Sequence, residues 1–215
     1  MVDRATVEVL RVAIDLHLAS GGLFDVAIGC ALVRSGFLPR AGLGQLRAYP
    51  GTMADLDLID DTHVCVRRRT LLDLGGIAKG FAVDRAIAVL EHAGVAAALV
   101  NAGGDLRGFG PRDWPVHLRD ADGEVRFMVP IRNCAMATSS NLVNRRRYRG
   151  SEQSPHIGAG GKCVLVSHRV SVIAATCIAA DALTKVALAD PALAGRLAGR
   201  YGARLLDPPK DGSAQ

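Results

Sequence analysis

The chain has 215 residues, of which 26 are Lys or Arg and 21 are Asp or Glu, so its formal net charge is +5. Hydrophobic residues make up 49% and charged residues 22%, a globular composition that excludes a disordered or collagen-like chain. No apolar run approaches the roughly 18 residues of a membrane-spanning helix. Charged residues also interrupt the first twenty positions, where a signal peptide has an unbroken apolar centre. We therefore expect no membrane span and, for the chain as it stands, a cytoplasmic location.

The spacing of the cysteines and the composition of the basic runs argue against several kinds of site. The five cysteines are widely spaced and form no CxxC pair, which argues against a disulfide framework or a zinc knuckle and favours reduced thiols. The two basic runs, residues 67–69 and 145–147, lack the interleaved aromatic residues of a base-stacking surface. We expect no nucleic-acid partner. Each run is either a solvated loop or strand end, or borders an anionic ligand such as a phosphate.

The first third of the chain is predicted to hold two helices, a long loop and a strand. Apolar residues at helical spacing predict a helix over residues 2–19, which a Gly-Gly pair ends. A short helix follows at about residues 26–34. Residues 36–61 are rich in Gly, Pro and Asp and are expected to contain little regular structure. Residues 62–68 alternate as a strand does.

The middle of the chain combines a helix with strands. A long helix is predicted over residues 77–93, and Gly94 closes it. A buried strand follows over residues 95–100. Residues 114–119 and 124–130 are typical of a hairpin.

The last third alternates strands, a polar loop and helices. A short strand is predicted at residues 134–138, a mobile Gly-rich loop at 141–162 and a strand at 163–174. Helices are predicted over residues 176–189, capped by Thr176, and 191–201, with proline in the first turn. Strands arrive both as hairpins and with helices between them, which indicates an α+β fold of mixed or antiparallel sheets with packed helices. We expect one domain over residues 1–206 and a polar tail over 207–215.

Two double-glycine turns follow apolar strands. The first is Asp73-Leu74-Gly75-Gly76-Ile77-Ala78-Lys79-Gly80, where glycines meet a helix start. Glycine lets a ligand approach the backbone, the helix N-terminus presents free N–H groups, and Lys79 adds a cation. The run matches neither the Walker A nor the GxGxxG pattern, so it is either a phosphate or pyrophosphate site or a tight structural turn. The second turn, at residues 101–107, is by itself a weaker signal.

An acidic residue stands within the otherwise apolar helix predicted over residues 176–189. A buried carboxylate such as Asp181 is costly unless it is paired or binds a cation. Thr184 faces the same side, so carboxylate and hydroxyl oxygens there can share a hard ion such as magnesium. The alternative is an ion pair between Asp181 and Lys185 at i+4, which the spacing alone favours.

Among the six histidines, His156 is the best candidate for a general base. It follows Ser154-Pro155 in the polar Gly-rich loop, and functional residues concentrate in such loops. The alternative is an ordinary solvated histidine.

Taken in order, these runs resemble the FAD:protein FMN transferase family, the ApbE proteins. The run at residues 73–84 is the most specific, and the resemblance covers the chain from about residue 5 to about residue 190. The matching runs are residues 21–25, 73–84, 101–106, 137–140, 154–157 and 170–188. The resemblance implies an α+β fold with a cleft between two sub-structures.

The same resemblance implies an activity and a set of site residues. Members of the family hold FAD with a magnesium ion at its pyrophosphate and transfer FMN to a threonine hydroxyl of a partner flavoprotein, releasing AMP. FAD would then be the substrate, Mg²⁺ the cofactor, and an acceptor flavoprotein with a threonine motif the partner. The implied roles are FAD contacts for Leu23, Phe24, Asp25, Asp73, Lys79 and Ile157, metal binding for the Gly76 carbonyl, Asp181 and Thr184, and activation of the acceptor threonine for His156.

The chain departs from the family pattern in three places. It starts after a strand-bearing segment, as a shortened product or a natural short form, and an exposed sheet edge would favour a homo-oligomer. The Asp-Pro expected after Ile157 is replaced by glycines and an alanine. Lys185 stands where the family has a metal-binding threonine, so either Thr184 supplies that ligand or the Lys185 ammonium occupies the place of the metal. The alternatives to a transferase are a non-catalytic flavin-binding or interaction relative, and an FAD pyrophosphate hydrolase.

Overall fold

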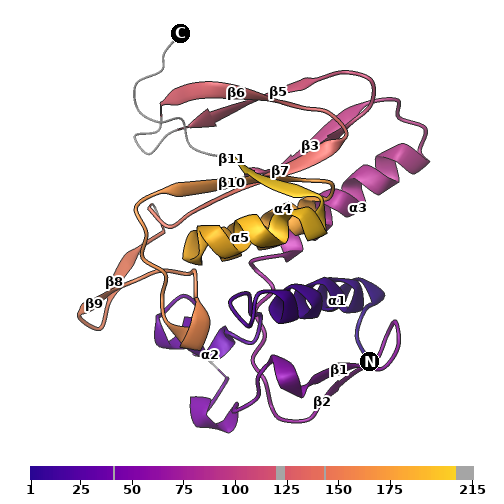
Figure 1. The fold of residues 1–215 in the computed structure, drawn as a ribbon. Helices are drawn as coiled ribbons and strands as arrows, with labels where there is room; N and C mark the ends of the chain where they lie inside the picture. The colour runs from indigo at the N-terminus through magenta and orange to yellow at the C-terminus, as the bar shows by residue number, and fades with distance from the viewer. Residues whose placement is uncertain (41, 120–123, 143, 207–215) are drawn as a thin grey trace. The chain divides into compact units, whose positions relative to one another are not determined.

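The computed structural model describes residues 1–40, 42–119, 124–142 and 144–206. The chain divides into two compact units (Figure 1). The first unit comprises Met1–Ala78 and Val143–Leu165, and the second comprises Lys79–Leu142 and Val166–Gln215. The predicted turn at residues 120–123 and the predicted tail at 207–215 lie outside the described residues.

The first unit is built from two helices and two small hairpins. Their bounds are α1 (Arg4–Ala19), α2 (Gly29–Arg34), β1 (Leu56–Leu58), β2 (Val64–Val66), β8 (Arg146–Tyr148) and β9 (Ser151–Gln153), with 3-10 turns at Leu46–Ala48, Met53–Asp55 and Ala159–Gly161. β1 pairs with β2 and β8 with β9, both antiparallel.

Helix α1 confirms the first predicted helix. The Asp3 side chain caps its start by accepting a hydrogen bond from the Ala5 N–H at 2.8 Å. The predicted apolar face is mostly buried, as shown by Val7 and Leu10, although Leu18 is exposed. The helix ends where Gly21 and Gly22 take positive φ angles of 61° and 84°.

Two segments of the first unit that were expected to be irregular contain strands. Residues 36–61 hold β1, and the Gly-rich residues 141–162, expected to be a mobile loop, hold the β8–β9 hairpin. The expectation of little regular structure in residues 36–61 holds, because β1 has only three residues, whereas the loop predicted over residues 141–162 was wrong. Strands of three residues are too short to show alternation. β8 pairs with β9, and the Arg146 guanidinium of β8 lies 3.8 Å from the centre of the Phe37 ring.

The second unit is a five-stranded antiparallel sheet with a hairpin and helices around it (Figure 1). The strand order is β11-β10-β7-β4-β3. The sheet strands are β3 (Ala98–Ala102), β4 (Asp105–Phe109), β7 (Cys134–Ser140), β10 (Arg169–Ala174) and β11 (Ala203–Leu206). The hairpin is β5 (Trp114–Arg119) with β6 (Val125–Ile131), and the helices are α3 (Ala78–His92), α4 (Cys177–Ala189) and α5 (Pro191–Ala198), followed by a 3-10 turn at Gly199–Tyr201.

The sheet separates two apolar clusters. Leu106, Met136 and Ile173 are buried on one face, where Trp114 and other hairpin residues pack against them. Ala135 is buried on the other face with Val83 of α3 and Cys177 of α4. Neighbouring residues such as Ala135 and Met136 point to opposite faces because side chains alternate along a strand. The expected combination of antiparallel strands and packed helices, an α+β fold, is confirmed.

Some details of the second unit differ from the predictions. β4 and β11 were not predicted, and β10 begins only at Arg169, because Cys163 forms a β-bridge with Ile157 instead of joining the sheet. β3 begins at Ala98 and continues to Ala102. Thr176 does precede α4, but its side chain makes no capping hydrogen bond.

The structure also bears on two expectations from the sequence, which concern membrane-spanning helices and cysteine pairing. No helix in the described ranges is both long enough and apolar enough to cross a membrane. All five cysteines are described, and each is a free thiol, as predicted.

Candidate functional site

Helices α3 and α4 of the second unit cap each other. Asp84 of α3 accepts hydrogen bonds from the backbone N–H groups of Cys177 and Ile178, at 2.9 and 2.8 Å, in the first turn of α4. In return, Asp181 Oδ2 of α4 accepts one from the Gly80 N–H, at 3.1 Å, in the first turn of α3. The first N–H groups of a helix have no hydrogen-bond partner within the helix, and the helix dipole places partial positive charge at this end. Both effects stabilise a carboxylate there. This reciprocal capping replaces the cap that was predicted from Thr176.

The close approach of the two helices explains the glycine in the Lys79-Gly80 pair. A Cβ atom at Gly80 would lie 2.4 Å from the Cys177 carbonyl oxygen, which is backbone and cannot rotate away. Any larger residue would push the helices apart and break the hydrogen bond to Asp181. The glycine therefore has a structural reason to be there.

Asp181 forms the predicted ion pair with Lys185. The carboxylate is fully buried, and its Oδ1 accepts from the Lys185 ammonium. The same ammonium donates to the Asp181 carbonyl at 3.1 Å, to Ser139 Oγ at 3.0 Å and to Thr184 Oγ1 at 3.2 Å. Thr184 in turn donates to the Asp181 carbonyl at 2.6 Å and lies 2.6 Å from Ser139 Oγ. The pairing alternative is confirmed, and the Thr184 hydroxyl is bound to the Asp181 backbone carbonyl, while Lys185 contacts both this hydroxyl and the carboxylate.

A second ion pair joins Lys79 to Asp105, at the start of β4. Burial and the nearby Asp181 charge raise the pKa of Asp105 above its usual range, although the hydrogen bond from Lys79 opposes them. Burial lowers the pKa of Lys79, but the hydrogen bond to Asp105 and the charge of Asp181 outweigh it, so the net shift is upward. Lys79 is therefore a cation at neutral pH.

A third pair extends this network. Arg107 Nη1 donates to Asp84 Oδ1 at 2.7 Å. Sequence reasoning gave no role to Asp84, Arg107 or Ser139. The signal for Asp84 was its place at the end of the most specific run, residues 73–84.

Cys177 lies beside this network but is not a reactive thiol. Its side chain is fully buried, and burial together with the negative charge of Asp84 raises its pKa far above neutrality. A thiol with such a pKa stays protonated and is a poor nucleophile.

In the first unit, two predicted FAD-binding runs lie side by side. The Asp73 N–H donates to the Val26 carbonyl at 2.8 Å, and the Gly29 N–H donates to the Leu71 carbonyl at 3.0 Å. The structure thus joins the segment containing Leu23, Phe24 and Asp25 to the strand exit at Asp73.

The predicted side chains on these runs have local partners. Phe24 is buried, and Leu23 is partly buried. Asp25 Oδ1 accepts from the Ala27 N–H at 2.6 Å, and burial raises the pKa of Asp25. Asp73 Oδ2 accepts from the Gly75 N–H at 3.2 Å. The N–H groups of Ile77 and Ala78 both donate to the Leu74 carbonyl, so the run around Gly76 forms the tight turn that was one of its two interpretations.

His156 lies in a loop that is closed by its own backbone. The His156 N–H donates to the buried Ser154 Oγ at 3.1 Å, and its carbonyl accepts from the Val164 N–H at 2.8 Å. Ile157 pairs with Cys163, and the Gly158 N–H donates to the Lys162 carbonyl at 2.8 Å. These bonds fix the loop although the Asp-Pro of the family is missing.

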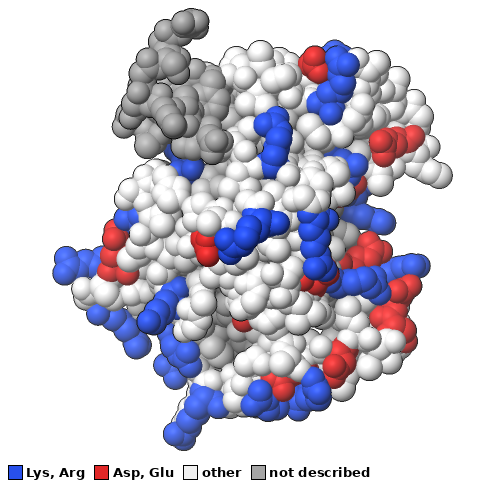
Figure 2. Space-filling model, in the orientation of Figure 1, with Lys and Arg blue, Asp and Glu red and all other residues white. Residues whose placement is uncertain are grey.

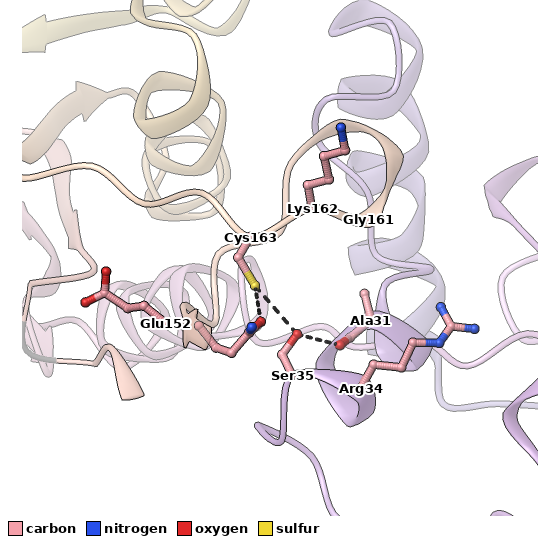
Figure 3. Close-up of a pocket in the computed structure, with 8 residues that line it drawn as sticks. Ala31, Arg34, Ser35, Glu152, Gly161, Lys162 and Cys163 are labelled. Atoms are coloured by element: carbon pink, nitrogen blue, oxygen red, sulfur yellow. Dashed lines mark hydrogen bonds between the residues drawn. The ribbon is translucent and has the colours of Figure 1, made fainter. Parts of the chain in front are cut away.

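The first unit also contains a cavity of about 390 Å³ between α2 and the segment 152–163 (Figure 3). Cys163 Sγ donates to Gln153 Oε1 at 3.0 Å and lies 3.6 Å from Ser35 Oγ. None of the predicted site residues lines this cavity; the lining residues are Ala31, Arg34, Ser35, Glu152, Gln153, Gly161, Lys162 and Cys163. Arg145, Arg146 and Arg147 border a second hollow, and the surface of the β8–β9 hairpin is mainly basic (Figure 2).

Comparison with known proteins decides the family. The ApbE family profile matches residues 1–201. The chain belongs to the ApbE family. Within that family, it is 35% identical over 169 residues to the FAD:protein FMN transferase of Rhodobacter capsulatus. The aligned region covers 73% of this chain and 32% of the relative. It is 25% identical over 205 residues to the Escherichia coli protein of the same name, covering 84% of this chain and 58% of the relative. This ApbE chain thus spans between about a third and somewhat over half of the length of these curated relatives.

Solved structures of ApbE proteins share the fold. The ApbE protein of Thermotoga maritima matches with a TM-score of 0.80 and 26% identity, over 95% of this chain and 73% of that one. The apo form of the flavinyl transferase ApbE of Pseudomonas stutzeri matches with a TM-score of 0.73 and 25% identity, over 93% of this chain and 67% of that one. These matches confirm the α+β fold that the sequence predicted.

Proposed function

We propose that this ApbE chain transfers FMN from FAD to a threonine hydroxyl of a partner flavoprotein and releases AMP. The observation that supports the proposal is its similarity to two proteins named FAD:protein FMN transferase, over 73% and 84% of its own length. The acceptor residue, the leaving group and the roles of single residues go beyond that similarity and form part of the proposal.

In the proposed reaction, the threonine oxygen attacks the flavin-side phosphorus of FAD. The bond from that phosphorus to the bridging oxygen breaks, and AMP leaves with the oxygen. His156 takes the proton of the attacking hydroxyl as general base. Lys79 supplies positive charge to the diphosphate. The flavin nucleotide contacts are assigned to Leu23, Phe24, Asp25, Asp73 and Ile157.

The magnesium ion implied by the family does not fit the side chains found around Asp181. Asp181 Oδ1 is bound to the Lys185 ammonium, and the Thr184 hydroxyl is hydrogen-bonded to Ser139 and to the Asp181 carbonyl. A divalent ion needs such oxygens free of a competing cation. The proposed transfer therefore assigns no step to a metal.

The test is an incubation of the purified protein with FAD and threonine-containing peptides, each paired with its Thr→Ala counterpart. We expect AMP and covalently attached FMN in equal amounts with the threonine peptides only. His156→Ala should lower the rate by about 100-fold or more, whereas His168→Ala, an exposed histidine of the second unit, should leave it unchanged. Absence of AMP with every acceptor, both with magnesium and with chelator, would refute the catalytic proposal.

One observation favours a second candidate, a non-catalytic flavin-binding relative. Asp181 and Asp105 pair with Lys185 and Lys79, so the four charges sum to zero and leave no formal excess to attract a diphosphate. This candidate predicts FAD binding without AMP release. The hydrolase alternative predicts AMP and free FMN in the absence of any acceptor, so product analysis separates all three.

A further inference from the structure

The Lys185 ammonium of the second unit lies inside a set of four oxygen atoms. They are Asp181 Oδ1, the Asp181 carbonyl oxygen, Ser139 Oγ and Thr184 Oγ1, and we call them the oxygen cage. The last three lie 3.1, 3.0 and 3.2 Å from Lys185 Nζ. Carboxylate, carbonyl and hydroxyl oxygens are the donors that hard cations such as Mg²⁺ and Mn²⁺ take in proteins. In this chain, the cation in the cage belongs to the protein itself.

The cage is part of the interior. Asp181 and Thr184 are completely buried, Ser139 is 6% exposed, and the Lys185 side chain is 18% exposed. A buried carboxylate without a positive partner is strongly unfavourable. The ammonium offers three N–H donors to four oxygens, and the Asp181 carbonyl also accepts from the Thr184 hydroxyl, so the ammonium and this hydroxyl together supply the cage with donors.

The cage is also held in place by its elements. Asp181 and Thr184 lie on α4, and the carboxylate is bound through Oδ2 to the first turn of α3. Ser139 lies on β7, against which α4 packs. Three hydrogen bonds that do not involve Lys185 also hold these residues: Asp181 Oδ2 with the Gly80 N–H, Thr184 with the Asp181 carbonyl, and Thr184 with Ser139.

A divalent ion and Lys185 cannot share this space. Mg²⁺ binds oxygen at about 2.0–2.1 Å, so an ion on Asp181 Oδ1 would lie against the ammonium that already contacts this atom. Two cations at such a distance repel strongly in a site of low dielectric. We propose that Lys185 is the resident cation of the oxygen cage, that it excludes divalent metals, and that removing its charge turns the cage into a metal site.

The proposal also deepens the proposed function, and in that respect rests on it. If the diphosphate of FAD binds beside this cage, its affinity does not depend on a divalent metal, because Lys185 already occupies the place of that metal. FAD binding is then insensitive to chelators.

The test uses Mn²⁺ as the probe, because its free form gives an electron paramagnetic resonance signal that disappears on binding. The unmodified chain and Lys185→Arg, which keeps the charge, should bind no Mn²⁺ that depends on Asp181. Lys185→Thr removes the charge and adds a hydroxyl, and should bind one Mn²⁺ per chain about 100-fold or more tighter than the unmodified protein. Adding Asp181→Asn to Lys185→Thr should abolish this binding. Lys185→Met removes the charge without adding an oxygen and should bind Mn²⁺ more weakly than Lys185→Thr.

Two results would overturn the proposal. One is a Mn²⁺ ion bound to the unmodified protein and lost in Asp181→Asn. The other is no gain of Mn²⁺ in the charge-removing variants that fold, judged by circular dichroism, so Lys185→Met decides the matter if Lys185→Thr does not fold.

A fluorescence titration with FAD, in EDTA or in MnCl₂, forms a separate arm. Equal affinity within about twofold supports the proposal, and loss of binding in EDTA contradicts it. Absence of FAD binding in both conditions counts against the proposed function, while the Mn²⁺ result still decides the role of Lys185.

Discussion

Two carboxylates of the first unit and two of the second unit of this ApbE chain are held in different ways. In the first unit, Asp25 and Asp73 each bind a backbone N–H only two residues further along the chain. In the second unit, Asp84 binds the backbone 93 and 94 residues away, and Asp181 binds it 101 residues away. Local bonds shape a loop and leave the rest of the fold unaffected. Long-range bonds make the geometry of the cluster depend on the packing of the whole unit.

The largest effect is expected for Asp84→Ala. It leaves two N–H groups of α4 and the Arg107 guanidinium without their acceptor, so we expect the second unit to lose about 3 kcal/mol of unfolding free energy. Trp114, the single tryptophan, lies in this unit and reports its unfolding in urea by fluorescence. Asp84→Asn retains one acceptor oxygen and should lose clearly less. Equal, small losses in both variants would show that reciprocal capping contributes little.

Gly80→Ala is expected to have the next largest effect. The new Cβ atom meets the Cys177 carbonyl oxygen, so the helices must separate at a cost of about 2 kcal/mol. The matched control is Gly195→Ala in α5, where no atom lies within 4 Å of the added Cβ, and which should gain about 0.5–1 kcal/mol from helix propensity. Urea unfolding followed by Trp114 measures both. A gain at Gly80 like the one expected at Gly195 would mean that helix propensity outweighs the contact.

In the first unit, Arg146→Ala should act weakly and locally. Its guanidinium lies 3.8 Å from the centre of the Phe37 ring, a cation–π contact worth about 0.5–1 kcal/mol at an exposed site. We expect faster amide hydrogen exchange in the β8–β9 hairpin and no change in the Trp114 signal. Arg149→Ala, whose guanidinium lies 5.5 Å from the Tyr148 ring, is the control and should change exchange less. Destabilisation of the second unit by Arg146→Ala would contradict the local character of this contact.

The smallest effect concerns pH and Asp60, another residue with local partners. The Thr62 N–H and the His63 side chain lower the pKa of Asp60 to about 2. The folded chain therefore binds this proton only near pH 2, whereas the unfolded chain binds it near pH 4. The stabilisation is present above pH 4 and is lost as the pH falls towards 2. Carbon NMR of the carboxyl group measures the midpoint, Asp60→Asn removes the resonance for assignment, and a midpoint near 4 would contradict the prediction.

The sequence predicted the long elements of the fold and some short ones, such as α2 and β2, and it missed others. Helices α1, α3 and α4 have enough turns to show a period of 3.6 residues, and the β5–β6 hairpin shows alternation over six residues or more. Strand β4 was missed because Asp105, Arg107 and Gly108 conceal its alternation. These residues are in a strand because β3 and β7 pair with it on either side, which is tertiary information.

The sequence indicated residues of the candidate site only where a polar residue stands in an otherwise apolar segment. Asp181 stood out because a carboxylate in an apolar helix needs a partner, and Lys185 was found because i+4 pairs lie on one helix face. Asp84 gave no such conflict, since a charged residue on a helix surface is ordinary. Its hydrogen bonds to α4 come from a crossing of two helices that no local pattern encodes. For His156 and the FAD contacts, the structure describes loop geometry and leaves their chemical roles as predictions.

The reciprocal capping of α3 and α4 has a consequence for biosynthesis. Residues 78–92 leave the ribosome long before Asp181 has been translated. During this time the Gly80 N–H in the first turn of α3 lacks its acceptor, the Asp181 carboxylate. Strands β7 and β10 are both made before α4. Strands β3, β4, β7 and β10 are therefore available as a template by the time α4 emerges, whereas the edge strand β11 follows it. A nascent chain halted before Cys177 contains none of the hydrogen bonds by which α3 and α4 cap each other.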